Sequence, residues 1–193
     1  TRYVHINRLR NDTVLATLLG LKKIVSEDSV RRALKAADEQ ELSTWLSRHE
    51  KDIFDKLLEH QYILDIDNTV KPIFGHQEGA EIGYNPKKPG RPSHNFHSYF
   101  IGSIRISLGV DVQPGKRHSG KCSMPRLWEI IDNLSDEKKP RLIRGDVGYG
   151  GDETMCEAEQ RGLMYLFKLR RTKSVFALFR RYENAHGWRN TQD

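Results

Sequence analysis

Three aspartates stand in or at the end of expected strands, and carboxylates so placed can hold a divalent metal. Asp65 and Asp67 lie in YILDIDNT (62–69), whose β-branched and aromatic residues predict a strand. Side chains two residues apart on a strand point to the same face. Asp146 ends RLIRGD (141–146), another expected strand, and a glycine-rich turn follows. Because Mg²⁺ binds one or two carboxylates together with phosphate oxygens and water, this pattern indicates metal-dependent chemistry on a phosphate ester.

The elements that must position these acids are strands and helices after residue 61. We expect strands at 62–69, 96–107, 108–112, 141–146 and 163–169, and helices at 127–134 and 153–162. Gly and Pro are frequent in residues 75–93 and predict a loop. Three successive strands followed by alternating helices and strands predict an α/β fold, with a mixed sheet flanked by helices.

The first 60 residues show a different pattern. Apolar residues recur at helical spacing through 12–60, and Ser26 is placed to cap a helix that begins with two acidic residues. We therefore expect three parts: an N-terminal helical segment (1–60), a catalytic core (61–170) and a basic segment (171–193) that begins an insertion or a C-terminal part.

The charge distribution favours a polyanionic partner. The chain has 193 residues and a net charge of +6. Residues 161–193 hold eight basic and two acidic side chains, whereas residues 1–160 hold 24 of each. Mean hydropathy is −0.68, and no apolar run reaches the roughly 18 residues of a membrane-spanning helix. Three basic groups are candidates for contacts with DNA phosphates: Lys87, Lys88 and Arg91; Lys116 and Arg117; Arg170 and Arg171.

The acidic motif resembles two families, of which the first is the haloacid-dehalogenase-like phosphatases. DIDNTV (65–70) is similar to their Asp-x-Asp-x-Thr motif, and the resemblance implies Asp65 as a phosphorylated nucleophile and Asp67 as the acid and base. GDVGYGGD (145–152) is loosely similar to their metal-binding acids. The sequence departs from that family because the motif lies behind a helical segment, with neither the expected Ser or Thr nor the following Lys.

The second resemblance, to the DDE-type transposases of bacterial insertion sequences, covers most of the chain. It is carried by LDIDNTVKPIFGHQEGAEIGYNPKKPGRPSHNFHSYF (64–100), with QPGKRHSG (113–120), IRGDVGYG (143–150) and SEDSVRRAL (26–34) in the family's order. The resemblance implies an RNase H-like core. It also implies Asp67, followed by Thr69, as the first catalytic and metal-binding acid, with Asp65 as its competitor, and Asp146 as the second.

The same resemblance implies a reaction and its partners. The expected activity is metal-dependent cleavage and transfer of DNA strands, with Mg²⁺ or Mn²⁺ as cofactor and no nucleotide cofactor. The expected partners are double-stranded DNA, as element terminal repeats and as target, and a second copy of the protein in a homodimer. The resemblance also implies a location in the bacterial cytoplasm, in association with the nucleoid and without a membrane anchor.

The third acid of the family, a Glu in a later Tyr- and Arg-rich helix, has no match before Asp193. We expect it beyond residue 193, so that the chain is a fragment of the enzyme. Two alternatives stay open: the Mg²⁺-dependent phosphatase with Asp65 as nucleophile, and an inactive, truncated transposase that only binds DNA.

Overall fold

The computed structural model describes residues 3–58, 61–117 and 119–187 of the chain. By its internal contacts the chain divides into two compact units, residues 1–53 and 54–193. Within the described residues, no helix is long and apolar enough to cross a membrane.

The first unit is helical, as the apolar spacing predicts. It contains α1 (Val4–Leu9), α2 (Thr13–Leu18), α3 (Glu27–Ala36) and most of α4 (Glu39–Leu57). The Ser26 hydroxyl accepts a hydrogen bond from the backbone N–H of Ser29 at 3.1 Å, which confirms Ser26 as the cap of α3. Residues 59 and 60, the end of the expected helical segment, lie outside the described residues.

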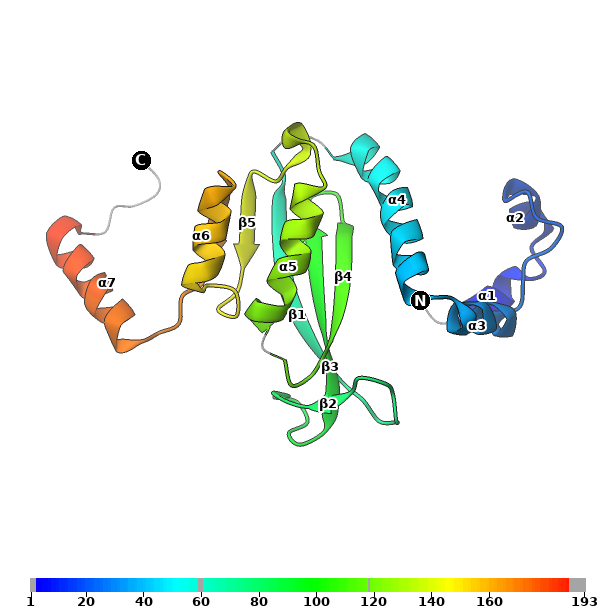
Figure 1. Cartoon of the computed structure of the whole chain (residues 1–193), viewed down its shortest axis with the longest axis horizontal. Coiled ribbons are helices and arrows are strands. Elements are labelled where there is room, and N and C mark those ends of the chain that lie inside the picture. The colour runs from blue at the N-terminus through cyan, green and yellow to red at the C-terminus, as the bar shows by residue number, and fades with distance from the viewer. Residues whose placement is uncertain (1–2, 59–60, 118, 188–193) are drawn as a thin grey trace. The chain divides into compact units, whose positions relative to one another are not determined.

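The second unit is built around a six-stranded sheet (Figure 1). Its elements are β1 (Ile63–Pro72), β2 (Glu81–Ile82), β3 (Pro92–Ile101), β4 (Ile106–Pro114), α5 (Ser119–Asp132), a 3-10 turn (Asp136–Lys138), β5 (Leu142–Gly145), α6 (Asp152–Gln160), β6 (Met164–Phe167) and α7 (Lys173–His186). The order across the sheet is β4-β3-β1-β5-β6, and the short β2 pairs with the start of β3. β3 is antiparallel to β1 and β4, whereas β5 is parallel to β1 and β6. This mixed sheet is the expected RNase H-like arrangement.

Two strand predictions need correction. The expected strand 96–107 is two strands, because the chain turns back at residues 102–105 and Ile101 pairs with Ile106. Arg105 takes a positive φ of 56°, an uncommon conformation for a non-glycine residue, so the composition of this segment gives little sign of the turn. The expected loop 75–93 also contains β2 and the first residues of β3.

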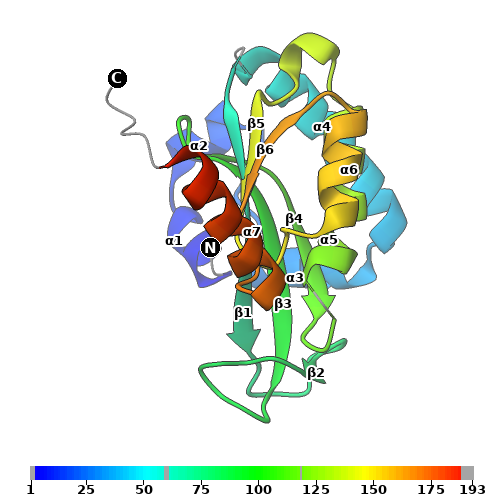
Figure 2. The same ribbon diagram turned by 90° about the vertical axis from the view of Figure 1, so that its left-hand side faces the viewer.

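Helices α5 and α6 lie on the same side of the sheet (Figure 2) and cover its apolar face. The core beneath them joins Leu64 and Ile66 of β1, Tyr99 of β3 and Ile143 of β5 to Leu127 and Ile131 of α5. Because neighbouring side chains on a strand alternate between faces, Asp65 and Asp67 point to the opposite face of the sheet. The packing that holds the sheet together therefore leaves the acids outside the core.

We expect the substitution Ile131→Ala to lower the free energy of unfolding by about 2–5 kcal/mol, since Ile131 is fully buried between α5 and the sheet. The matched substitution Ile82→Ala removes the same atoms from a side chain that is 61% exposed, and should change stability by less than about 0.5 kcal/mol. Urea unfolding followed by circular dichroism measures both. Equal effects would contradict this assignment of the core.

Candidate active site

The pairing of β1 with β5 brings two of the predicted acids side by side. The strands are parallel, with Asp65 opposite Arg144 and Ile66 opposite Gly145. The next position on each chain holds Asp67 and Asp146, and both carboxylates are exposed. Ile143 points into the core, so Arg144 lies on the opposite face, and alternation places Asp146 there too. Asp67 and Asp146 therefore lie together on the face that α5 and α6 leave uncovered.

Asp65, the competitor for the role of first acid, has a different environment. The Arg144 guanidinium donates through Nε to Asp65 Oδ1 at 2.6 Å and through Nη2 to Oδ2 at 3.0 Å. This two-pronged geometry engages both carboxylate oxygens of Asp65. Among the described residues, no such ion pair engages Asp67. A metal would have to displace the guanidinium in order to bind Asp65, whereas Asp67 is available.

The turn after β5 fixes the second acid. Asp146 Oδ1 accepts a hydrogen bond from the Gly148 N–H at 2.8 Å, and its carbonyl accepts one from the Tyr149 N–H at 3.2 Å. The turn then passes close to the end of β6, where a Cβ on Gly150 would lie 2.6 Å from the Lys168 carbonyl oxygen. Gly150 therefore lets the turn close tightly behind Asp146.

A buried polar pair supports this turn from the other face of the sheet. His97 of β3 is fully buried, and its Nδ1 is hydrogen-bonded to the Tyr149 hydroxyl at 3.2 Å. Burial lowers the pKa of His97, and the negative charges of Asp111 and Asp67 oppose that shift. Burial also raises the pKa of Tyr149, and the charge of Asp146 adds to the effect. The pair is thus neutral near pH 7 and holds the turn of Asp146 against β3.

A cavity of about 740 Å³ extends from Asp146 along the exposed end of β1. It is lined by Asn68, Thr69 and Val70 of β1, by the turn after β5, and by four basic residues predicted to contact DNA: Lys87, Lys116, Arg117 and Arg170. The other three predicted contacts do not line it. Of these, the Arg91 guanidinium stacks over the Phe74 ring at 4.5 Å, while Lys88 and Arg171 are exposed neighbours of lining residues. The fold gathers basic residues from three separate segments beside the second acid.

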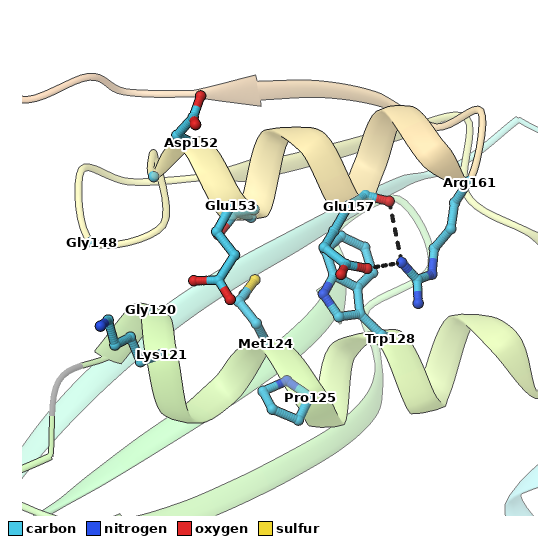
Figure 3. Close-up of a pocket in the computed structure, with 12 residues that line it drawn as sticks. Gly120, Lys121, Met124, Pro125, Trp128, Gly148, Asp152, Glu153, Glu157 and Arg161 are labelled. Carbon is cyan, nitrogen blue, oxygen red and sulfur yellow. Dashed lines mark hydrogen bonds and ion pairs between the residues drawn. The ribbon is translucent and has the colours of Figure 1, made fainter.

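A second hollow, of about 690 Å³, lies between α5 and α6 (Figure 3). Met124, Pro125 and Trp128 of α5 face it, and Glu153 and Glu157 of α6 border it. Arg161 closes one end, where it is paired with Glu157 and stacked over the Trp128 ring at 4.6 Å. Neither Asp67 nor Asp146 lines this hollow, although Gly148 of the turn after β5 lines both it and the cavity beside Asp146.

The donor set of Asp67 and Asp146 suits a hard cation such as Mg²⁺, which takes one or two carboxylates and completes its shell with water and phosphate oxygens. Within the described residues, no group of three or more Asp, Glu, His or Cys side chains is close enough to hold a metal. A third protein ligand would have to approach Asp67 and Asp146 on the uncovered face.

Sequence reasoning missed three residues that shape this site. Arg144 and Tyr149 stand within the quoted motif IRGDVGYG, but the motif does not say that one engages Asp65 and the other supports the turn. His97 lies 52 positions before its partner Tyr149. A sign of its burial is its place among alternating inward-facing residues of β3, which run from Ser93 to Ile101.

Comparison with known proteins identifies the family to which the chain belongs. Residues 3–192 match the family model of the transposase DDE domain, group 1. The match spans nearly the whole chain, and the chain therefore belongs to this family of DDE transposases. The predicted resemblance to the DDE-type transposases is thus confirmed, and the phosphatase alternative is not favoured.

Solved structures with a similar arrangement are distant in sequence. The simian T-cell lymphotropic virus intasome in complex with PP2A regulatory subunit B56 gamma is 15% identical, with 67% of this chain and 43% of that chain covered and a TM-score of 0.37. The HTLV-2 integrase catalytic core in complex with magnesium is 17% identical, with 70% and 79% covered and a TM-score of 0.36. The piggyBac transposase synaptic complex with hairpin DNA is 11% identical, with 81% and 36% covered and a TM-score of 0.47. The chain thus spans less than half of the first and third of these proteins. No match was found among curated proteins.

The depressed pKa of His97 predicts a loss of stability in acid. In the unfolded chain His97 titrates near 6.5, and burial lowers that pKa in the folded protein. Its contribution is therefore complete above about pH 6.5 and is lost as the pH falls through the folded-state pKa, because the unfolded chain then binds the extra proton. Urea unfolding at about pH 7.5 and about pH 5 should show a smaller difference for His97→Gln than for the wild type.

The control for this experiment is His94→Gln, which changes the half-buried histidine on the opposite face of the same strand. It should leave the pH dependence as in the wild type. An unchanged pH dependence in His97→Gln would show that His97 does not carry the effect.

Proposed function

We propose that this chain supplies the first two acids, Asp67 and Asp146, with which a DNA transposase cleaves the strands at insertion-sequence ends and joins them to target DNA. The observation that carries the proposal is the pairing of β1 with β5, which sets Asp67 beside Asp146 on one face and next to a basic cavity. Ligands of sheets with parallel strands commonly bind at the carboxyl ends of those strands. Asp146 directly follows the end of β5, and Asp67 follows the last residue of β1 that pairs with β5.

The reaction assigns a distinct task to each group. Asp67 and Asp146 would hold Mg²⁺ or Mn²⁺, and the bound metal would activate the attacking oxygen and stabilise the leaving oxygen of the phosphodiester. Neither carboxylate acts as a nucleophile, so water or a freed 3′-hydroxyl attacks directly. Arg144 keeps Asp65 engaged outside the metal site, and the His97–Tyr149 pair keeps the turn of Asp146 in place.

The partners follow from the same reaction. The basic residues around the cavity would bind the phosphates of double-stranded DNA, both of the element ends and of the target. Joining two ends to one target requires that two active sites be held together, so we infer a homodimer in the assembled complex. The third acid would come from an element that approaches the uncovered face. We place the protein on the bacterial nucleoid, in the cytoplasm, where its substrate lies.

Substitution of the paired acids should abolish cleavage. We expect Asp67→Asn and Asp146→Asn to reduce Mg²⁺-dependent nicking of a terminal-repeat duplex by at least roughly 100-fold, because loss of an outer-shell partner of a metal already costs 10–100-fold. Asp65→Asn should retain activity within about fivefold, since Asp65 pairs with Arg144 at the surface and ion pairs there contribute little. Gel analysis of nicked products in the natural transposase measures all three.

The same variants separate the alternatives. The phosphatase reading requires Asp65→Asn to abolish hydrolysis of p-nitrophenyl phosphate, with duplex DNA left uncut by the wild type. The inactive transposase reading requires salt-sensitive DNA binding with no nicking by the wild type or any variant. Nicking by Asp67→Asn and Asp146→Asn at the wild-type rate would overturn the proposed function.

DNA binding should weaken with salt in proportion to the phosphates contacted. We expect Lys87→Gln to lower the slope of log affinity against log salt by about 0.9, the value for one lost phosphate contact. Lys139→Gln is the matched control, because Lys139 precedes β5 at the end away from Asp146 and is paired with Asp136. Fluorescence anisotropy with a labelled duplex and Ca²⁺ measures both slopes. Equal slopes for Lys87→Gln and Lys139→Gln would show that Lys87 does not contact a DNA phosphate.

A further inference from the structure

Two segments of the cavity wall pack against each other with direct backbone contact at Gly83 and Gly115. We call this contact the Gly83–Gly115 joint. A Cβ on Gly83 would lie 1.9 Å from the Gly115 carbonyl oxygen. A Cβ on Gly115 would lie 2.2 Å from Ser93 Oγ and 2.7 Å from the Glu81 carbonyl oxygen. No other residue type can replace either glycine without moving the backbone. The segment that leads to Lys87 is thereby locked onto the segment that carries Lys116 and Arg117.

Two buried asparagines then fix the conformation of these segments. Asn95, which is 3% exposed, donates through Nδ2 to the carbonyl oxygens of Gly115 at 3.5 Å and Arg117 at 3.2 Å. Asn85, which is 4% exposed, accepts a hydrogen bond from the Lys88 N–H at 3.0 Å. Side-chain amides that hydrogen-bond to the backbone of a loop in this way restrict the conformations of that loop before any ligand binds.

The same asparagines carry an energetic penalty. Asn85 Nδ2 and Asn95 Oδ1 are buried and have no hydrogen-bond partner among the described residues. A buried polar atom without a partner costs about 1–3 kcal/mol. Native proteins contain few such atoms, and functional sites are among the places where they are tolerated. Both asparagines belong to the lining of the cavity.

The cations of this wall all border the same cavity. Among the described residues, Lys87, Lys116, Arg117 and Arg170 line the cavity, and Asp146 is the one acidic residue that does so. Four cations and one anion leave the cavity positive even before a metal binds at Asp146. A phosphodiester carries the single negative charge and the exposed oxygens that such a wall binds. Because Asp146 belongs to both the cavity and the acid pair, a phosphate held there lies close to the one that is cleaved.

We propose that the cavity is a preformed binding site for one DNA phosphodiester next to the scissile one, and that binding there determines which bond is cut. The proposal rests on the proposed function of Asp67 and Asp146. It gives the Gly83–Gly115 joint and the two asparagines a positioning role, because they hold the cations without touching the reacting atoms.

The test uses a series of duplexes, each with one uncharged methylphosphonate in place of a single phosphate. The series covers several phosphates on both sides of the scissile bond. In the wild type, one of these positions should lower the rate of cleavage by about tenfold, the loss of one charge-assisted contact. In Lys116→Gln/Arg117→Gln, substitution at that same position should change the rate less than about twofold, since the contact is already absent. Lys139→Gln should keep the wild-type sensitivity.

The outcomes distinguish this proposal from the proposed function. No cleavage of the unmodified duplex by the wild type would overturn the proposed function. Cleavage of the unmodified duplex without a sensitive position, or with the same sensitive position in the double variant, would overturn only the phosphate site.

The positioning role has its own readout. Gly83→Ala should shift or broaden the set of cleaved bonds on a sequencing gel. The added Cβ would displace the segment that leads to Lys87 from the segment that carries Lys116 and Arg117, so the cations would no longer hold the phosphate in one position. Gly75→Ala is the control, since the three atoms nearest to a Cβ there all belong to the flexible Gln77 side chain, the first of them at 3.2 Å. An unchanged cleavage position in a folded Gly83→Ala protein would overturn the positioning role. If Gly83→Ala does not fold, the methylphosphonate experiment alone decides the proposal.

Discussion

The parallel register of β1 and β5 is the constraint on which the whole site depends. It is set by the inward-facing Leu64, Ile66 and Ile143, because a slip of one residue would send a core side chain to the wrong face. In this register Asp65 meets Arg144, and the next outward-facing step sets Asp67 beside Asp146. Hydrophobic packing on one face of the sheet thus determines which carboxylates meet on the other.

The two faces of the sheet have opposite characters. One is covered by α5 and α6, whereas the other exposes Phe100 at 37%, Val110 at 56% and Leu166 at 59% around the acids. Parallel strands are usually covered on both faces. Contact of another surface with this apolar area would expel water from around the acids. Electrostatic interactions there would then strengthen, because the local dielectric constant falls. The uncovered face is therefore suited to a reaction on a charged group in an assembled complex.

The sequence was informative where local rules decide the structure. Ser26 caps α3, and Gly162, the last residue of the helix expected at 153–162, ends the turn after α6 with a φ of +65°. It was uninformative where distant segments decide. The turn at 102–105 depends on Arg105 adopting a positive φ, and the Gly83–Gly115 joint depends on two loops that meet only in the folded sheet. The acids could be chosen from strand pattern and family resemblance, but the engagement of Asp65 by Arg144 could not.

The basic cavity resolves a conflict within the site. Carboxylates are needed to hold a metal, yet Asp67 and Asp146 repel the phosphates of DNA wherever no metal is bound. The positive excess of the chain lies after residue 160 and contributes only Arg170 to the described cavity lining, whereas the other three cavity cations belong to the balanced part of the sequence. What matters is where the fold places them. Lys87, Lys116 and Arg117 offset the acids because the glycine joint and the two asparagines hold them beside Asp146.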